Sequence, residues 1–181
     1  FLLTIGEGFE YREMAQSPIF AMEPIKKEPG RHIPDDNPFL GADDVLPQIW
    51  SYGHRNAQGL YYDAQSDRVW AHEHGPRGGD EVNIIEPGNN YGWPIATGGI
   101  DYSGARISPF ESHEGFAAPV REWTPSIAPS GLTLYRGEAF PDWQGDLFAG
   151  ALSDREVHRL ALDGAEVVEE EILFTEPGER I

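Results

Sequence analysis

The chain has 181 residues, with 31 acidic side chains against 13 Lys and Arg, a formal net charge of −18 and no cysteine. The negative charge excludes nucleic acid as a partner because its phosphates would be repelled, and the lack of cysteine excludes disulfides and thiol chemistry. No apolar run approaches the roughly 20 residues that span a bilayer. The excess of acidic side chains suits solubility, a cationic partner or a hard metal ion.

The first segment, FLLTIGEGFE at residues 1–10, is typical of a strand entered part-way, and it lacks the basic region and cleavage site of a signal peptide. Residues 13–39 show little strand pattern. The last residues, TEPGERI, stop just after a turn signal. We therefore expect residues 1–181 to form a single partial domain that is truncated at both ends.

Short apolar runs bounded by Gly, Pro, Asn and Asp recur along the chain, whereas helical periodicity is hard to find. The middle of the chain predicts strands at 59–63, 68–74 and 81–85, with AQSD as the first turn. The C-terminal part predicts a four-stranded up-and-down meander, with strands at 131–135, 146–152, 156–162 and 166–174. A repeated four-stranded antiparallel unit is the signature of an all-β propeller. A sandwich or a jelly roll is the alternative all-β arrangement.

The stretch SYGHRNAQGL, residues 51–60, places a base, a permanent cation and an amide side by side in His54, Arg55 and Asn56. Arg55 and Asn56 suit an anionic, oxygen-rich ligand, because a guanidinium presents a rigid set of donors to carboxylate or quinone oxygens. The alternative is that Arg55 pairs with one of the many surface carboxylates, a contact of little energetic value.

The stretch EHGPRGGDEVNIIEPGNNYGWP, residues 73–94, surrounds one strand with loops rich in glycine and proline. Asp80 and Glu81 point to opposite faces of that strand, so they do not chelate one ion together. One of them is a candidate to join backbone carbonyls around a calcium ion, the alternative being a turn cap. His72 and His74 share one strand face, but no third ligand follows at the usual spacing of a zinc site.

Aromatic side chains follow this stretch, and Tyr91, Trp93, Tyr102 and Trp123 are candidates for the wall of a pocket that holds a flat cofactor or a sugar ring. The alternative is packing between blades. The stretch ALSDR, residues 151–155, and Arg180 each follow a blade strand, where propellers place the residues at the mouth of their channel.

Four motifs in order, IWSYGHRNAQGL, EHGPRGGDEVNII, GNNYGWP and DYSG, resemble the soluble pyrroloquinoline-quinone (PQQ)-dependent sugar dehydrogenases, which include aldose sugar, soluble glucose and sorbosone dehydrogenases. The weaker EWTPSIAPSG, LFAGALSDREV and GERI extend the resemblance to the C-terminus. It implies a six-bladed β-propeller that binds PQQ and Ca²⁺, oxidises an aldose sugar at C1 by hydride transfer to the quinone, and lies in the periplasm or is secreted.

By position in these motifs, the resemblance assigns contacts with the cofactor or its calcium ion to Arg55, Asn56, Gly75, Pro76, Tyr102 and Arg180. Arg55 would stabilise the charge that grows on the reactive quinone oxygen, and the carbonyls of Gly75 and Pro76 would help to hold the ion. The carboxylate of Glu81 and the backbone carbonyl of Tyr91 match a second, structural calcium site.

Two departures from the family pattern bear on activity. The catalytic base of the family is a histidine in an earlier blade, and no histidine here matches its motif, so the chain is expected to be inactive alone. Ser153 stands where many relatives carry a cationic residue for the cofactor. The alternatives are therefore a non-catalytic, calcium-stabilised binding propeller and a calcium-dependent hydrolase of the lactonase type.

Overall fold

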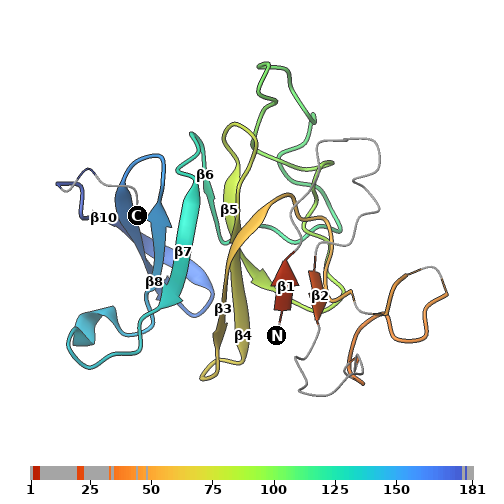
Figure 1. Cartoon of the computed structure of the whole chain (residues 1–181), viewed down its shortest axis with the longest axis horizontal. Helices are drawn as coiled ribbons and strands as arrows, with labels where there is room; N and C mark the ends of the chain where they lie inside the picture. The colour runs from red at the N-terminus through yellow and green to blue at the C-terminus, as the bar shows by residue number, and fades with distance from the viewer. Residues whose placement is uncertain are drawn as a thin grey trace.

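The structure is a computed structural model that describes residues 2–4, 20–22, 33, 35–43, 45–47, 49–176 and 178. Within these residues the regular elements are ten strands and one short 3-10 helix, η2, at Pro141–Trp143 (Figure 1). β1 (Leu2–Thr4) and β2 (Phe20–Met22) pair as a small sheet of their own. No helix in the described part of the chain is long and apolar enough to span a membrane.

The first four-stranded sheet runs in chain order through β3 (Ala57–Asp63), β4 (Arg68–Glu73), β5 (Asp80–Ile85) and β6 (Arg121–Trp123). Every neighbouring pair is antiparallel. The three expected strands and the AQSD turn are confirmed. β6 escaped prediction because a long loop separates it from β5 and only three residues pair, which leaves no readable alternation.

The second four-stranded sheet consists of β7 (Pro129–Leu134), β8 (Leu147–Ala151), β9 (Glu156–Asp163) and β10 (Glu166–Leu173). It is the expected antiparallel meander, with strand ends within two residues of those predicted. Each sheet is built only from consecutive strands. This connectivity is that of propeller blades, because a Greek-key sandwich would exchange strands between its sheets.

One apolar core joins the two sheets. Trp70 and Val82 of the first sheet pack with Leu147 and Leu160 of the second, all of them buried. Fully burying a leucine contributes roughly 1.5–3 kcal/mol. Ala71 follows Trp70 on β4 and therefore faces the other side of the sheet, where it belongs to a second, smaller cluster. The partial β-propeller of four-stranded antiparallel blades is thus confirmed.

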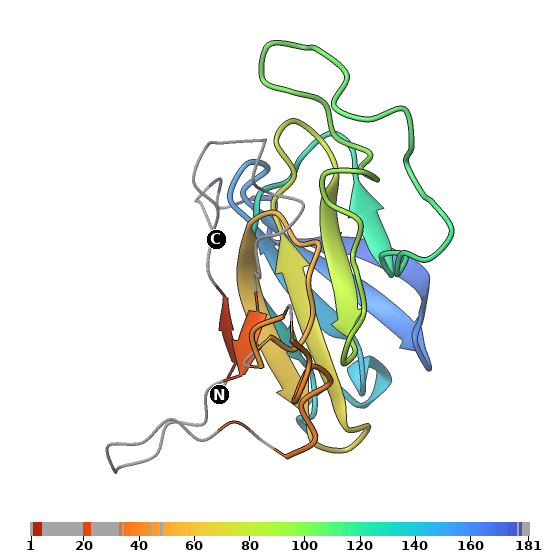
Figure 2. The ribbon, with the colours of Figure 1, turned by 90° about the vertical axis from the view of Figure 1, so that its right-hand side faces the viewer.

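Strand direction brings several loops to one end of both sheets, the upper end in Figures 1 and 2. β3, β5 and β7 begin at this end, and β4, β6 and β8 finish there. The long segment between β5 and β6 also projects there. The residues predicted from the motifs before β3 and between β4 and β5 therefore meet in space.

Candidate functional site

The segment before β3 is anchored by Glu73, the last residue of β4. One carboxylate oxygen of Glu73 accepts hydrogen bonds from the backbone N–H groups of Arg55 and Asn56, the latter at 3.1 Å. The other oxygen lies 3.3 Å from Nδ1 of His54, whose ring stacks on Tyr91 at 4.4 Å between centroids. His54 is buried in these contacts, whereas Arg55 and Asn56 stay partly exposed. Of these three residues, Arg55 and Asn56 thus keep surface that a ligand could reach.

The guanidinium of Arg55 has no acidic partner in the described part of the chain. Its Cζ lies 5.3 Å from the centre of the Trp93 ring, within the range of a cation–π contact. Nη1 donates to the backbone carbonyl of His74 at 2.7 Å. A guanidinium carries five N–H donors. Among the described residues, Arg55 therefore does not form the ion pair with a surface carboxylate that was the alternative.

The glycine-rich loop between β4 and β5 is shaped by Asp80. The two carboxylate oxygens of this fully buried residue accept hydrogen bonds from the backbone N–H groups of Gly75 and Ala128, each at 2.8 Å. The loop is tight, because a Cβ added to Gly75 would lie 2.0 Å from the carbonyl oxygen of Gly78. Of the two adjacent acids, Asp80 is the turn cap, and it ties this loop to the start of the second sheet.

Two small cavities lie at Glu81, the first beside this loop and the second beside the segment before β6. The first, of about 10 Å³, is lined by Arg55, Glu73, His74, Gly75, Gly79, Glu81, Tyr91, Trp93, Ala96 and Thr97. The second, of about 30 Å³, shares Glu81 and Tyr91 with the first. A cavity needs roughly 10–15 Å³ to hold one water-sized particle. Both cavities therefore suit an ion or a water, and the predicted pair Glu81 and Tyr91 lies at both.

Glu81 carries a carboxylate in an unfavourable electrostatic environment. Burial, and then the nearby charge of Glu73, raise the pKa of Glu81 well above its ordinary value. Asn83 Nδ2 donates to Oε2 at 3.1 Å, which opposes the effect, and no cationic side chain of the described residues pairs with Glu81. A bound cation would compensate this charge, and Ca²⁺ accepts carboxylate together with backbone carbonyl oxygens.

The hydroxyl of Tyr91 makes two hydrogen bonds to the backbone and is therefore not available as a metal ligand. It donates to the carbonyl of Ile84 at 2.6 Å and accepts the N–H of Glu86 at 2.8 Å. Burial raises the pKa of Tyr91 to about 12, so the phenol stays protonated. A metal contact from Tyr91 would therefore come from its backbone carbonyl, as the resemblance implies.

Four further sequence predictions have different outcomes. Trp123 lies in the core between the sheets. The prediction that it lines a pocket is therefore wrong, and the alternative of packing between blades is confirmed. Tyr102 is 61% exposed and lines neither small cavity. Ser153 is exposed on the turn between β8 and β9. Arg180 lies outside the described residues.

His72 and His74 do not form the pair of ligands that their spacing allows. His72 is fully buried, and burial lowers its pKa. His74 donates through Nε2 to the carbonyl oxygen of Pro129 at 2.7 Å. His74 is thus a second link between the glycine loop and the start of β7.

Sequence reasoning missed two groups of residues. Glu73 was not singled out, because the backbone N–H groups that bind it belong to Arg55 and Asn56, which only the fold brings beside it. Asp154, Glu156 and His158 form the one cluster of three metal-ligating side chains found among the described residues. The i, i+2 spacing of Glu156 and His158 places them on one face of β9, and the turn before the strand brings Asp154 beside them.

Known proteins share this fold and these motifs. The model of the family described as Glucose / Sorbosone dehydrogenase matches residues 1–181. The chain is 46% identical to aldose sugar dehydrogenase YliI of Escherichia coli over 151 residues. This alignment covers 82% of this chain and 41% of that protein. A crystal structure of a glucose dehydrogenase matches with a TM-score of 0.88 and 40% identity over 99% of this chain and 52% of that one.

A structure of the PQQ-bound form of an aldose sugar dehydrogenase from Streptomyces coelicolor matches with a TM-score of 0.69 and 27% identity, over 99% of this chain and 47% of that one. The chain thus spans about half, or less, of the length of these relatives. The match of the family model over the whole chain nevertheless settles the family. The chain belongs to the glucose/sorbosone dehydrogenase family.

Proposed function

We propose that this chain is the cofactor-binding part of a PQQ-dependent dehydrogenase that oxidises an aldose sugar at C1. The observation that carries the proposal is Arg55, a partly buried cation in a very acidic chain that pairs with no carboxylate of the described residues. Its guanidinium lies over Trp93 and beside the glycine loop. Such a cation suits an anionic ligand, and PQQ offers both carboxylate and quinone oxygens.

The chemistry that the quinone supplies when bound is acceptance of a hydride from the sugar. Arg55 would donate to the quinone oxygen on which negative charge grows. Contacts with the His74 carbonyl and the Trp93 ring already hold its guanidinium, which reduces the cost of reorganisation. Gly75 and Pro76 are both buried in the tight loop and would offer backbone carbonyls to a calcium ion on the cofactor.

Asn56 and Tyr102 would supply further cofactor contacts. The Asn56 side chain lies beside Arg55 and accepts a hydrogen bond from Gln58 Nε2 at 2.9 Å through Oδ1. The Tyr102 ring is exposed and accessible to a ligand from the solvent side. Arg180 completes the cofactor contacts that we propose.

The proton acceptor for the sugar hydroxyl would come from another part of the protein. Neither His54 nor His74 is placed for this role, because His54 is buried beside Glu73 and Tyr91 while His74 is bonded to the Pro129 carbonyl. We therefore expect the chain alone to bind the cofactor without turning over sugar. Action in the periplasm or outside the cell belongs to the same proposal.

A structural calcium ion bound by Glu81 and the Tyr91 carbonyl is the second half of the proposal. Its support is the raised pKa of Glu81, caused first by burial and then by Glu73, together with the ion-sized cavities that Glu81 and Tyr91 both line. This ion would stabilise the loops on both sides of β5. It would act on the fold and take no part in hydride transfer.

The test is equilibrium binding of PQQ to the chain, with calcium or with a chelator, followed by the absorbance of the quinone. Dye reduction by aldoses is then measured in a protein that also contains the upstream blades. Saturable, calcium-dependent binding at micromolar concentrations together with sugar-dependent dye reduction is the expected result. Failure to bind PQQ would overturn the dehydrogenase proposal.

A non-catalytic, calcium-stabilised binding propeller is the second candidate function, and Ser153 favours it. This exposed serine offers no charge to the cofactor at the turn between β8 and β9. In the same experiment, calcium binding without PQQ binding would identify such a module. Lactone hydrolysis in the absence of quinone would instead indicate a hydrolase.

A further inference from the structure

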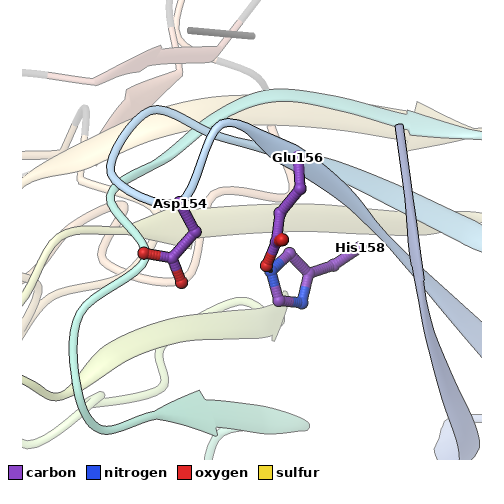
Figure 3. A group of neighbouring side chains, drawn as sticks. All are labelled: Asp154, Glu156 and His158. Carbon is purple, nitrogen blue, oxygen red and sulfur yellow. Dashed lines mark ion pairs between the residues drawn. The ribbon is translucent and has the colours of Figure 1, made fainter. Parts of the chain in front are cut away.

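A cluster of three side chains lies at the turn between β8 and β9, on the second sheet and away from Glu81. Asp154 is exposed on the turn, Glu156 is partly buried at the start of β9, and His158 is buried two residues further on (Figure 3). One ligand atom from each lies within 4.8 Å of the others. From this geometry we propose that Asp154, Glu156 and His158 bind a divalent transition-metal ion such as Zn²⁺.

His158 is oriented by a carboxylate on the neighbouring strand. Its Nδ1 lies 2.6 Å from Oε1 of Glu170, which also accepts the indole N–H of Trp123 at 2.7 Å. The other oxygen of Glu170 pairs with Arg121 at 2.5 Å. Because Glu170 acts as an acceptor throughout, Nδ1 carries the proton of the hydrogen bond. A carboxylate that fixes the ring in this way is the usual companion of a metal-binding histidine.

The other ring nitrogen of His158 is buried and makes no hydrogen bond within the described part of the chain. It lies 3.2 Å from Oε1 of Glu156. When Nδ1 alone carries a proton, the lone pair of Nε2 faces a negatively charged oxygen, a repulsive contact that a bound cation between the two atoms, or a second ring proton, would remove. Two ligands on one tetrahedral zinc ion are separated by about 3.3 Å. The observed separation therefore matches a shared ion.

The mixture of ligand types identifies the class of metal. One imidazole nitrogen and two carboxylates suit zinc or a neighbouring transition metal, with water in the remaining position. Calcium and magnesium prefer shells made of oxygen alone. The cluster also shares no residue with the cavities at Glu81 and Tyr91. It is therefore independent of the calcium site proposed above.

The experiment is a titration of the metal-free full chain with Co²⁺ and then Zn²⁺, in excess calcium so that oxygen-only sites are filled. Visible absorption of bound Co²⁺ and isothermal calorimetry report binding at micromolar concentrations. Asp154→Asn is the informative variant, because an exposed turn residue can change without loss of the fold. Asp163→Asn, at the other end of β9 and also exposed, is the matched control.

We expect one equivalent of Co²⁺ to bind with the spectrum of a nitrogen-ligated ion, and Zn²⁺ to displace it. Asp154→Asn and Glu156→Gln should each weaken binding at least tenfold, and Glu170→Gln should weaken it by roughly 10–100-fold, as changes to such companions do. Asp163→Asn should bind like the unmodified chain. Absence of Co²⁺ binding, or binding that Asp154→Asn and Glu156→Gln leave unchanged, would overturn the proposal.

Discussion

Arg136 binds Asp63 through two hydrogen bonds, with Nη2 2.7 Å from Oδ2 and Nε 3.3 Å from Oδ1, and so joins the end of β3 to the segment after β7. The Asp63 carboxylate is 3% exposed, whereas the Arg136 side chain is 30% exposed. The hydrogen bond from Arg136 is the largest of the effects that hold the pKa of Asp63 well below its ordinary range, and burial opposes it. The two blades are therefore linked by a charge that the folded state keeps ionised.

Asp63→Asn should lower the free energy of unfolding at neutral pH by roughly 2–3 kcal/mol. Breaking a fully buried pair costs about 3–5 kcal/mol, and the loss is smaller here because water reaches Arg136. A depressed pKa stabilises the fold fully above the unfolded value of about 3.9, and this stabilisation is lost as the pH falls further. Urea unfolding should therefore show the full difference at neutral pH, a somewhat smaller one near pH 3, and loss of the remainder only as the pH falls towards the depressed pKa of the folded state. Asp67→Asn, at an exposed turn position, is the control. A difference that stays constant with pH would contradict the ion-pair explanation.

Glu81→Gln tests the structural calcium site. In excess calcium the variant should unfold at a lower temperature than the unmodified chain, because a ligand that binds only the folded state stabilises it. In chelator the variant should be as stable or more stable, since Gln removes a carboxylate held close to Glu73. Thermal unfolding under both conditions gives the answer. An equal loss in calcium and in chelator would show that Glu81 is a structural residue without a metal.

Gly75→Ala tests the tight loop between β4 and β5. The added Cβ would lie 2.0 Å from the Gly78 carbonyl oxygen, so the loop must change shape at a cost of roughly 1–3 kcal/mol. Gly131→Ala is the matched control, because nothing lies within 4 Å of its Cβ position. Thermal unfolding and PQQ binding should both be impaired by the first change, and the second should stay within about 0.5 kcal/mol. Similar effects of the two changes would contradict the steric explanation.

Arg55→Lys tests the proposed cofactor contact while the charge is kept. Lysine lacks the planar set of donors, and loss of a hydrogen bond to a charged group costs about 1.5–3 kcal/mol, so PQQ affinity should fall roughly 10–100-fold. Arg77→Lys, an exposed change in the neighbouring loop, serves as the reference for PQQ titrations. Equal affinities for both variants would remove Arg55 from the cofactor site.

The sequence predicted the long strands well because each is a run of five or more residues bounded by turn signals. β4 is buried on both faces, since its neighbours Trp70 and Ala71 belong to different clusters. It missed β6, whose short pairing depends on the distant strand β5. The neighbours Arg55 and Asn56 could be predicted from their motif. The role of Glu73 and the bond between Asp80 and Ala128 could not, because these partners come from segments that only the fold brings together.

The links made by Asp80 and His74 have a consequence for local motion. Asp80 holds Gly75 and Ala128 at once, and His74 holds the carbonyl of Pro129, so the glycine loop is fastened to the first residue of the next blade. Opening the loop breaks contacts between blades as well as contacts within one. The rate at which the Gly75 amide hydrogen exchanges with solvent should then be limited by the rate at which the two blades separate. Ligand affinity at this loop and cohesion of the propeller would therefore rise and fall together.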